Sequence, residues 1–390
     1  MNNRFTSLHT LALAILVIAA GSKCVAQERD HQLGHFEFNG DSIALPMINQ
    51  NGHLKANVDF GDGVARSFIV DTGASVNVID SGVAESFGYE VIDEIEIGAP
   101  GGPQIPANVV KVPLAHVGDG TIVDAEFVTM DMVGFSGGST LGVIGMGLFR
   151  DYLLTFDYGQ SEIRVSRESL SAGSAGVMPY EFTNNLIHVD LNVAGTTVKS
   201  HIDTGSMGGF TLPVEIRKSL PLLDAEQSSI KAHVVGGDRD IQFKRLDGDI
   251  LFAGTTYENP EVALIDPSTG FGNVGSRILA EYMMSVDQAK QLIRFQKLTQ
   301  RPVTDAGNTP RRLGVQFRGM PGGTALTIGR VDSGSLAEQS GLLPGDVLVK
   351  LNDKATEEYD MPALGKLFRS TEPLRFDIDR GGQLLAIEID

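Results

Sequence analysis

The sequence predicts a mostly β protein with two similar β lobes, followed by a small α+β domain. Three observations support this fold class. The tripeptide Asp-Thr-Gly occurs twice in the 390 residues, at 71–73 and 203–205, each time after an apolar or β-branched run. A longer pattern repeats around both tripeptides. The character of the sequence then changes from about Arg312 onward. We therefore expect a duplicated unit joined to a separate module.

The duplicated unit extends well beyond the two tripeptides. Aligning Gly145 with Gly275 superimposes four further positions without a gap: Tyr152 on Tyr282, Asp157 on Asp287, Ile163 on Ile293 and Arg164 on Arg294. The offset is 130 residues here and 132 residues at the tripeptides, which indicates one unit present twice. Each repeated aspartate precedes a turn, so we expect structural roles for these aspartates and packing roles for the repeated tyrosines.

Short β-rich runs fill both copies, and clusters of Gly, Pro and Asn separate them, which is typical of antiparallel hairpins rather than βαβ units. The expected strands are residues 54–60, 67–70, 109–112 and 125–130 in the first copy, and 187–193, 198–202, 241–243 and 261–265 in the second. Each copy also carries a glycine-rich hairpin tip, at 98–102 and at 235–238. We therefore expect two similar all-β lobes.

The residue types of the tripeptide suit a catalytic carboxyl group. An aspartate at the end of a strand projects into a cleft, a neighbouring hydroxyl group can bond across it, and glycine admits a second backbone. Two carboxylates in one site cannot both ionise easily, so the pair holds one proton over a broad pH range. One member then acts as a base on water, and the other acts as an acid on an amide carbonyl.

The two tripeptides, each followed by a hydrophobic-hydrophobic-Gly element at 143–145 and, less cleanly, at 273–275, resemble the pepsin and retropepsin superfamily of aspartic proteases. The resemblance covers about residues 40–297. It implies that Asp71 and Asp203 are the catalytic pair. It also implies that the hydroxyl groups of Thr72 and Thr204 interlock beneath the carboxylates, an arrangement called the threonine grip below. Gly73 and Gly205 would donate backbone N–H groups to the carboxylates.

The sequence also departs from the pattern of that superfamily. Asn273 occupies the first position of the second hydrophobic-hydrophobic-Gly element. Pepsin-like enzymes have one flap that carries a tyrosine, and neither hairpin tip of this sequence contains a tyrosine. The presence of two similar tips is closer to the pattern of a retropepsin whose two halves are fused in one chain. The flap candidates are Gly101, Gly102, Gly236 and Gly237. His201, two residues before Asp203, is more typical of a packed strand histidine than of a group that tunes the pKa of the pair.

A structural alternative exists for the tripeptides themselves. Asp-Thr-Gly also forms Asx-type turns that close hairpins, and this interpretation would be favoured for a single copy. Two copies inside a duplicated lobe favour the catalytic interpretation instead. The remaining alternative is a folded relative that binds peptides without cutting them.

The C-terminal module, residues 312–390, resembles a PDZ domain. The run from Ser335 to Asn352 combines a short helix, a Pro-Gly-Asp turn and a strand. PDZ domains bind extended peptides, often C-termini, at a sheet edge, and a loop of backbone N–H groups captures the carboxylate. The resemblance places Leu313, Gly314 and Val315 in that loop and a helix within 361–369 along the groove. The alternative is a module that packs on the lobes and binds no free peptide.

These patterns divide the chain into six segments. We expect a signal peptide, a first lobe, a linker, a second lobe, a second linker and the PDZ domain, at residues 1–26, 27–165, 166–178, 179–298, 299–311 and 312–390. The chain is long enough for two or three hydrophobic cores, which agrees with this division.

The N-terminal residues predict export. Arg4, an apolar run at 11–20 and a polar stretch ending at Ala26 are typical of a cleaved secretory signal peptide. The apolar run is too short to span a bilayer of about 30 Å. Cleavage after Ala26 would remove two basic residues and no acid, which changes the net charge from −18 to −20. Lys23 before Cys24 argues against a lipoprotein, so we expect a periplasmic or secreted protein.

Composition excludes several other classes of function. The acidic net charge argues against nucleic acid or an anionic membrane as a partner. The 8 histidines lack metal-ligand spacing, and no glycine loop precedes a helical pattern in the way that phosphate binding requires. The single cysteine, Cys24, lies in the expected signal peptide. We therefore expect no metal, no cofactor and no cysteine nucleophile.

The sequence leads to three hypotheses. The first is an exported aspartic endopeptidase that acts on peptides or proteins, whose PDZ domain recruits or gates the substrate. The second is a catalytically silent peptide-binding or scaffold protein that uses the PDZ domain and the cleft between the lobes. The third is a protease restricted to one envelope or secreted partner protein.

Overall fold

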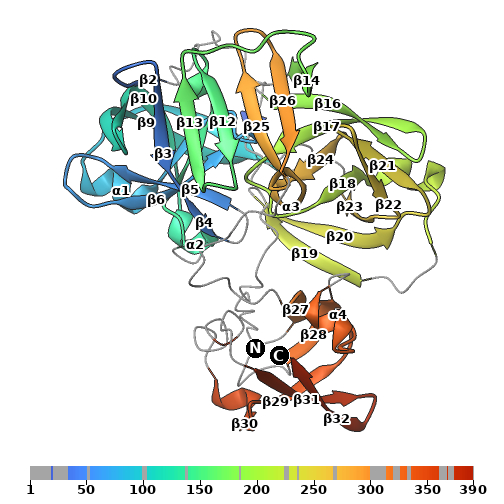
Figure 1. Cartoon of the computed structure of the whole chain (residues 1–390). Helices are drawn as coiled ribbons and strands as arrows, with labels where there is room; N and C mark the ends of the chain where they lie inside the picture. The colour runs from blue at the N-terminus through green and yellow to red at the C-terminus, as the bar shows by residue number, and fades with distance from the viewer. Residues whose placement is uncertain are drawn as a thin grey trace. The chain divides into compact units, whose positions relative to one another are not determined.

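The computed structural model describes residues 19–20, 34–50, 53–98, 103–136, 139–183, 186–223, 228–234, 237–266, 270–298, 313–318, 326–331, 335–359, 367 and 373–389 (Figure 1). The protein is mostly β, as the sequence predicted. It divides into two compact units, one formed mainly by Leu13–Ala225 and Lys231–Val303 and the other mainly by Thr304–Asp390. The first unit contains both Asp-Thr-Gly tripeptides.

One sheet forms the first lobe. Its strands follow the order β8-β9-β10-β7-β11-β6-β5-β4, with β1 (Ala19–Ala20) beside β8 and β2 (His35–Glu37) beside β10. The bounds along the chain are β4 (Ile48–Gln50), β5 (His53–Asp59), β6 (Arg66–Asp71), β7 (Asn77–Asp80), β8 (Val91–Gly98), β9 (Ile105–Val117), β10 (Gly120–Met130) and β11 (Gly142–Gly145). Three short helical segments lie between these strands or directly after them: α1 (Ser81–Ser86), α2 (Met132–Ser136) and η1 (Met146–Phe149).

The second lobe repeats this sheet. Its order β19-β20-β23-β18-β24-β17-β16 corresponds strand by strand to β8-β9-β10-β7-β11-β6-β5. The bounds are β15 (Glu181–Thr183), β16 (Leu186–Val193), β17 (Thr196–Asp203), β18 (Phe210–Pro213), β19 (Ser228–Val234), β20 (Gly237–Arg245), β21 (Asp249–Phe252), β22 (Thr255–Glu258), β23 (Glu261–Asp266) and β24 (Gly272–Gly275), with η2 (Val214–Ser219) and α3 (Ser276–Leu279). The duplicated sequence thus folds into duplicated sheets.

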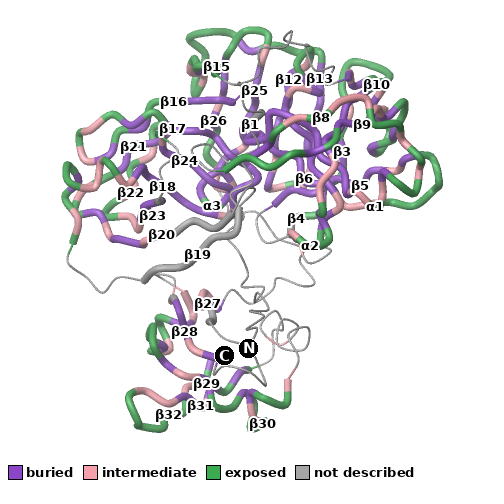
Figure 2. Tube along the Cα trace, turned by 180° about the vertical axis from the view of Figure 1, so that it is seen from behind, coloured by how far each residue is buried: buried purple, intermediate pink, exposed green. Residues whose placement is uncertain are grey.

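Each tripeptide follows a buried central strand. β6 pairs with β5 on one side and parallel to β11 on the other, and β17 pairs in the same way with β16 and β24. The parallel pairs place Gly145 opposite Asp71 and Gly275 opposite Asp203. A Cβ atom at Gly145 would lie 2.8 Å from the carbonyl oxygen of Ala74, so glycine is required there. Figure 2 shows the buried residues along β17 and β24.

A third sheet joins the two lobes. Its order is β14-β26-β25-β12-β13-β3, formed by β3 (Ser42–Pro46), β12 (Leu153–Asp157), β13 (Glu162–Ser166), β14 (Val177–Pro179), β25 (Tyr282–Asp287) and β26 (Leu292–Lys297). At its centre β12 and β25 pair antiparallel, with Thr155 opposite Ser285 and their hydroxyl oxygens 2.9 Å apart (Figure 1). These two residues are also related by the 130-residue offset, so a pseudo-twofold axis relates the lobes.

Strand β14 lies partly within the segment predicted as the linker 166–178. It pairs with β26 just as β3 pairs with β13, so each lobe is preceded by an outer strand of the joining sheet. The sequence did not reveal β14 because three residues are too few to show a period of two. Asp287, expected beside a turn, also accepts hydrogen bonds from Ser169 Oγ at 2.6 Å and from the N–H of Leu170 at 2.9 Å.

The C-terminal unit has its own sheet and core. Its strand order is β27-β28-β29-β31-β32, and β30 pairs with β29. The elements are β27 (Val315–Arg318), β28 (Leu326–Val331), α4 (Leu336–Gln339), β29 (Val347–Leu351), β30 (Lys354–Ala355), η3 (Thr356–Glu358), β31 (Leu374–Arg380) and β32 (Gln383–Ile389). Buried Ile328, Leu348 and Phe376 belong to its core. The expected helix within 361–369 lies outside the described residues, apart from Leu367, and so does the linker 299–311.

Candidate active site

The two tripeptides meet in the first unit and bond to each other reciprocally. The N–H group of Thr72 donates to Thr204 Oγ1 at 3.0 Å, and the N–H group of Thr204 donates to Thr72 Oγ1 at 3.0 Å. Each hydroxyl group then donates to a carbonyl oxygen of the opposite lobe, at 2.7 Å to Ile202 and 2.9 Å to Val70. Both threonines are fully buried. The interlocking geometry that the resemblance implied is present.

The glycines of the tripeptides bring the two backbones close to the carboxyl groups. The N–H groups of Gly73 and Gly205 both donate to Asp71 Oδ1, at 2.6 and 3.0 Å. A Cβ atom at Gly73 would lie 2.7 Å from Asp203 Oδ1, and one at Gly205 would overlap the carboxyl group of Asp71. No side chain fits at either position, so the tripeptide requires glycine there. Both N–H groups bond to one aspartate rather than one to each.

The carboxyl group of Asp203 has different partners. Its Oδ1 accepts from the N–H of Ser206 at 2.9 Å, and its Oδ2 accepts from Asn273 Nδ2 at 2.6 Å. Asn273 fits the hydrophobic-hydrophobic-Gly pattern poorly, and the sequence did not predict its contact with Asp203. The available signal was a polar residue where the first copy has Val143. It became informative only once β24 was placed beside β17.

Burial dominates the electrostatics of the pair. Both carboxyl groups are fully buried. Desolvation, followed by the charge of Asp203, raises the pKa of Asp71 well above its usual value. Desolvation also raises the pKa of Asp203, to about 6, although hydrogen bonds from Asn273 and Ser206 lower it in part. The pair therefore holds one proton near neutral pH and offers an acid and a base side by side.

His201 is a buried strand residue, as the sequence analysis favoured. It is fully buried, and its ring lies 5.6 Å from that of His188 and 5.9 Å from that of Phe271. Burial, with a smaller effect of His188, lowers the pKa of His201 to about 3. The imidazole is therefore neutral at physiological pH and adds no positive charge beside Asp203.

The predicted flaps correspond to the hairpins β8–β9 and β19–β20. Both hairpins lie at the same end of the strand order in their sheets. Gly237 is the first residue of β20. The other flap candidates, Gly101, Gly102 and Gly236, lie outside the described residues.

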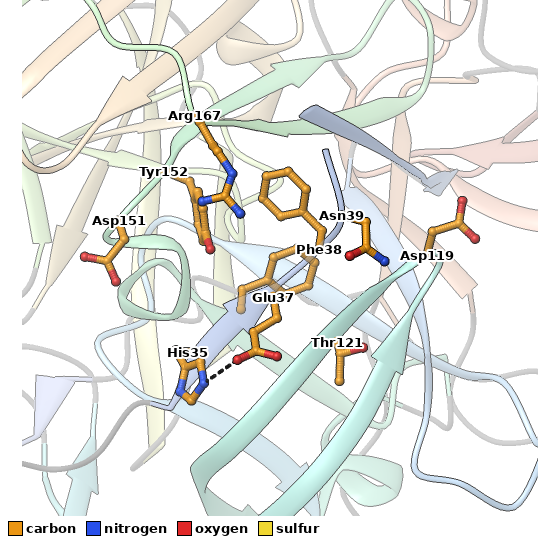
Figure 3. Close-up of a pocket in the computed structure, with 10 residues that line it drawn as sticks. His35, Glu37, Phe38, Asn39, Asp119, Thr121, Asp151, Tyr152 and Arg167 are labelled. Atoms are coloured by element: carbon orange, nitrogen blue, oxygen red, sulfur yellow. Dashed lines mark hydrogen bonds and ion pairs between the residues drawn. The ribbon is translucent and has the colours of Figure 1, made fainter. Parts of the chain in front are cut away.

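A surface pocket of the first lobe lies elsewhere (Figure 3). Its volume is about 540 Å³, and its lining residues include neither aspartate of the pair. Arg167 covers its aromatic residues, with the guanidinium carbon 5.0 Å from the ring of Phe38 and 5.5 Å from that of Tyr152. His35 Nε2 lies 3.0 Å from Glu37 Oε1 in the same pocket. The paired aspartates remain the stronger candidate for chemistry.

In the described part of the chain, no group of three or more His, Cys, Asp or Glu side chains is arranged to hold a metal ion. No helix in the same part is both long and apolar enough to cross a membrane.

The threonine grip generates a stability prediction. Thr204→Val removes a buried acceptor from the N–H of Thr72 and a donor from the carbonyl of Val70, and is expected to lower the free energy of unfolding by about 2–4 kcal/mol. Thr204→Ser keeps the hydroxyl group and should cost about 1 kcal/mol. Urea denaturation measures both. Equal costs for the two variants would show that the hydroxyl group contributes nothing.

Burial of Asp203 generates a pH prediction. Because its pKa rises from 3.8 to about 6 on folding, the folded state binds more protons within that window, so the free energy of unfolding falls as pH rises through it. Asp203→Asn removes this titration, so the stability of the variant relative to the unaltered protein should increase by on the order of 1–3 kcal/mol between pH 4 and pH 7.5. Loss of one hydrogen bond to Ser206 or Asn273 lowers its stability at both pH values. Urea denaturation of both proteins at the two pH values measures this increase; a stability difference independent of pH would contradict the prediction.

Comparison with known proteins agrees with this geometry. A model of the aspartyl protease family matches residues 55–148, which include Asp71 and the strands from β6 to β11. A model of the PDZ domain matches residues 327–379. No curated protein matches the chain. The chain thus contains an aspartyl protease domain in its first lobe and a PDZ domain in its C-terminal unit.

Proposed function

We propose that this protein is an aspartic endopeptidase that hydrolyses peptide bonds with a water molecule activated between Asp71 and Asp203. The observation that carries the proposal is the meeting of two fully buried carboxyl groups, one from each lobe, whose pKa values are raised together. Such a pair supplies both a base for water and an acid for the scissile carbonyl. The aspartyl protease match of the first lobe supports the same reaction class.

Geometry supports a single chain as the catalytic species. Each lobe contributes one aspartate, one threonine of the grip and one hairpin at the end of its sheet. The joining sheet fixes the two lobes through β12 and β25. The second half of the site is therefore supplied by the same chain, whereas a one-lobe protein would need a second copy.

The PDZ domain is proposed to recruit or gate the substrate. Gly314 adopts a φ of +68°, which turns the backbone between Leu313 and β27. The carbonyl oxygen of Leu313 accepts a hydrogen bond from the N–H of Ala337 at 2.9 Å, which anchors this loop to α4. Among the described strands β27 is one of the two edges of its sheet, and a peptide strand adds at such an edge. A peptide with a free C-terminus is the proposed ligand.

Export is proposed from the N-terminal residues. Arg4, the apolar run at 11–20 and the small residues before position 27 support a signal peptide cleaved after Ala26. Cleavage there would also remove β1. The proposed location is therefore the periplasm or the exterior of the cell, where protein substrates of the envelope or the medium are encountered.

Loss of either carboxyl group tests the proposed chemistry. Asp71→Asn and Asp203→Asn are each expected to abolish cleavage of an unfolded protein substrate, because each removes one half of the acid-base pair. Asp157→Asn is the matched control, since among the described residues the hydrogen bond of that side chain is the one it accepts from the N–H of Gln160 at 3.0 Å in a turn. Activity is measured on purified, folded variants. Full activity in either site variant would refute the proposal, and inactivity of the unaltered protein on all peptides tested would favour the silent peptide-binding alternative.

The PDZ role is tested at the loop before β27. Gly314→Val forces a β-branched residue into a φ of +68°, and is expected to weaken binding of a C-terminal peptide and slow cleavage of protein substrates. Cleavage of short peptides should be unchanged. Gly381→Val is the control, because Gly381 has a similar φ of +62° in the distant β31–β32 turn. Calorimetry and cleavage assays measure these effects; equal effects of both variants, or no change after removal of residues 312–390, would exclude a recruiting role.

A further inference from the structure

We propose that Asn273 is a positioning residue that makes Asp203 the base of the pair and leaves the shared proton on Asp71. This inference rests on the proposed function and names the role of each aspartate within it. It follows from the unequal hydrogen bonding of the two carboxyl groups, which the pseudo-twofold symmetry of the lobes would not produce by itself.

The donors around Asp203 occupy both of its oxygens. The N–H of Ser206 bonds Oδ1 at 2.9 Å and Asn273 Nδ2 bonds Oδ2 at 2.6 Å. An ionised carboxylate only accepts hydrogen bonds, whereas a protonated carboxyl group needs one oxygen that donates. With a donor on each oxygen, Asp203 has the environment of an ionised carboxylate.

The donors around Asp71 both reach the same oxygen. Gly73 and Gly205 donate to Oδ1, whereas Oδ2 is buried and has no hydrogen-bond partner among the described residues. A buried carboxyl oxygen without a donor is the favourable position for a proton, because a negative charge there would be neither solvated nor bonded. The shared proton therefore belongs on Asp71 Oδ2.

Sequence divergence at one repeated position produces much of this difference. The 130-residue offset relates Asn273 to Val143, which is fully buried and has no donor for Asp71. β24 fixes Asn273 between two strands, opposite His201 of β17 and Thr211 of β18. Backbone pairing on both sides thus fixes the Cα position of Asn273, from which its Nδ2 reaches Asp203 while its buried Oδ1 has no hydrogen-bond partner among the described residues.

The buried histidines and tyrosine near the pair do not oppose the effect of the amide. Buried titratable groups on the elements packed around the pair include Tyr158 after β12, His53 on β5 and His201 on β17. Burial raises the pKa of Tyr158 and lowers the pKa of His53 to about 4 and that of His201 to about 3, so all three are neutral near pH 7. The cation on β5, Lys55, donates to the carbonyl oxygen of Ser139 at 2.8 Å.

With Asp203 as the base and Asp71 as the acid, each proton transfer of the reaction has a defined donor and acceptor. Asp203 takes a proton from water as the water oxygen bonds the carbonyl carbon, and Asp71 gives its proton to the carbonyl oxygen. Asp203 then passes its proton to the leaving nitrogen as the C–N bond breaks, and Asp71 recovers a proton from the hydroxyl group as the new carboxylic acid forms. Both aspartates return to their starting states, and one water molecule is consumed.

Carboxyl titration of the full-length protein tests the assignment directly. In the unaltered protein with ¹³C-labelled aspartate, the Asp203 signal should titrate at a lower pH than the Asp71 signal. In Asn273→Val, which copies the residue of the first lobe, the Asp203 midpoint should rise by about 1–2 pH units, because a hydrogen bond to the charged form is lost. Asn192→Val is the control, since within the described part of the chain its side chain accepts one hydrogen bond, from the N–H of Gly195 in a turn.

The pH profile of kcat/KM is a second test of the effect of Asn273 on the pKa of Asp203. Its acid limb, set by ionisation of the base, should move upward in Asn273→Val by the same amount as the Asp203 midpoint, with kcat lowered more than KM is raised. A lower titration midpoint for Asp71 than for Asp203 in the unaltered protein, or an Asp203 midpoint unchanged or lowered by Asn273→Val, overturns the inference. If Asn273→Val does not fold, Asn273→Ala supplies the same test, because it also removes the donor to Asp203 Oδ2.

These experiments separate failure of the proposed function from failure of the role proposed for Asn273. If Asp71→Asn and Asp203→Asn keep their activity, the proposed function itself fails. If both are inactive while Asn273→Val leaves the titration unchanged, only the role of Asn273 fails.

Discussion

Two like-charged groups held together in one buried site constrain the whole first unit. Burial of the carboxyl groups of Asp71 and Asp203 is unfavourable, so the backbone around them must be held firmly enough to prevent the site from opening. Each aspartate ends a strand that is paired on both sides, and the threonines of the tripeptides bond each lobe to the other. The joining sheet adds the pairing of β12 with β25. Rigidity therefore comes from backbone pairing within and between the lobes.

The two lobes have the same strand order and differ in the side chains beside the aspartates. Both sheets have the same order of seven strands, yet the row beside the aspartate is apolar at Ile69 and Val143 in the first lobe and polar at His201 and Asn273 in the second. The two carboxyl groups thus end equivalent strands, and the proposed inequality between them comes from side chains that differ between the lobes. Two identical carboxyl groups can also share one proton, but neither then has a preferred role as donor or acceptor.

The two units of the protein have separate cores, which suits separate tasks. The lobes share one hydrophobic core across the joining sheet, with Phe156 and Met284 fully buried. The C-terminal unit is closed around Ile328, Leu348 and Phe376, and Arg380 makes a bidentate ion pair with the buried Asp346. In the proposed function, a PDZ domain with its own core binds and releases a ligand without repacking the proposed active site.

The sequence by itself determined the fold class, the duplication, the two aspartates that meet and the character of the C-terminal module. These follow from local patterns: repeated tripeptides, a fixed offset, and turn residues between β-rich runs. It underestimated strands such as β9, predicted at 109–112 and found at Ile105–Val117, because pairing with β8 and β10 extends it beyond its apolar stretch. Only the tertiary structure decided which donor reaches which carboxyl oxygen. That choice joins Asn273 to Asp203 across 70 residues and Gly205 to Asp71 across 134, and strand register rather than local sequence brings them together.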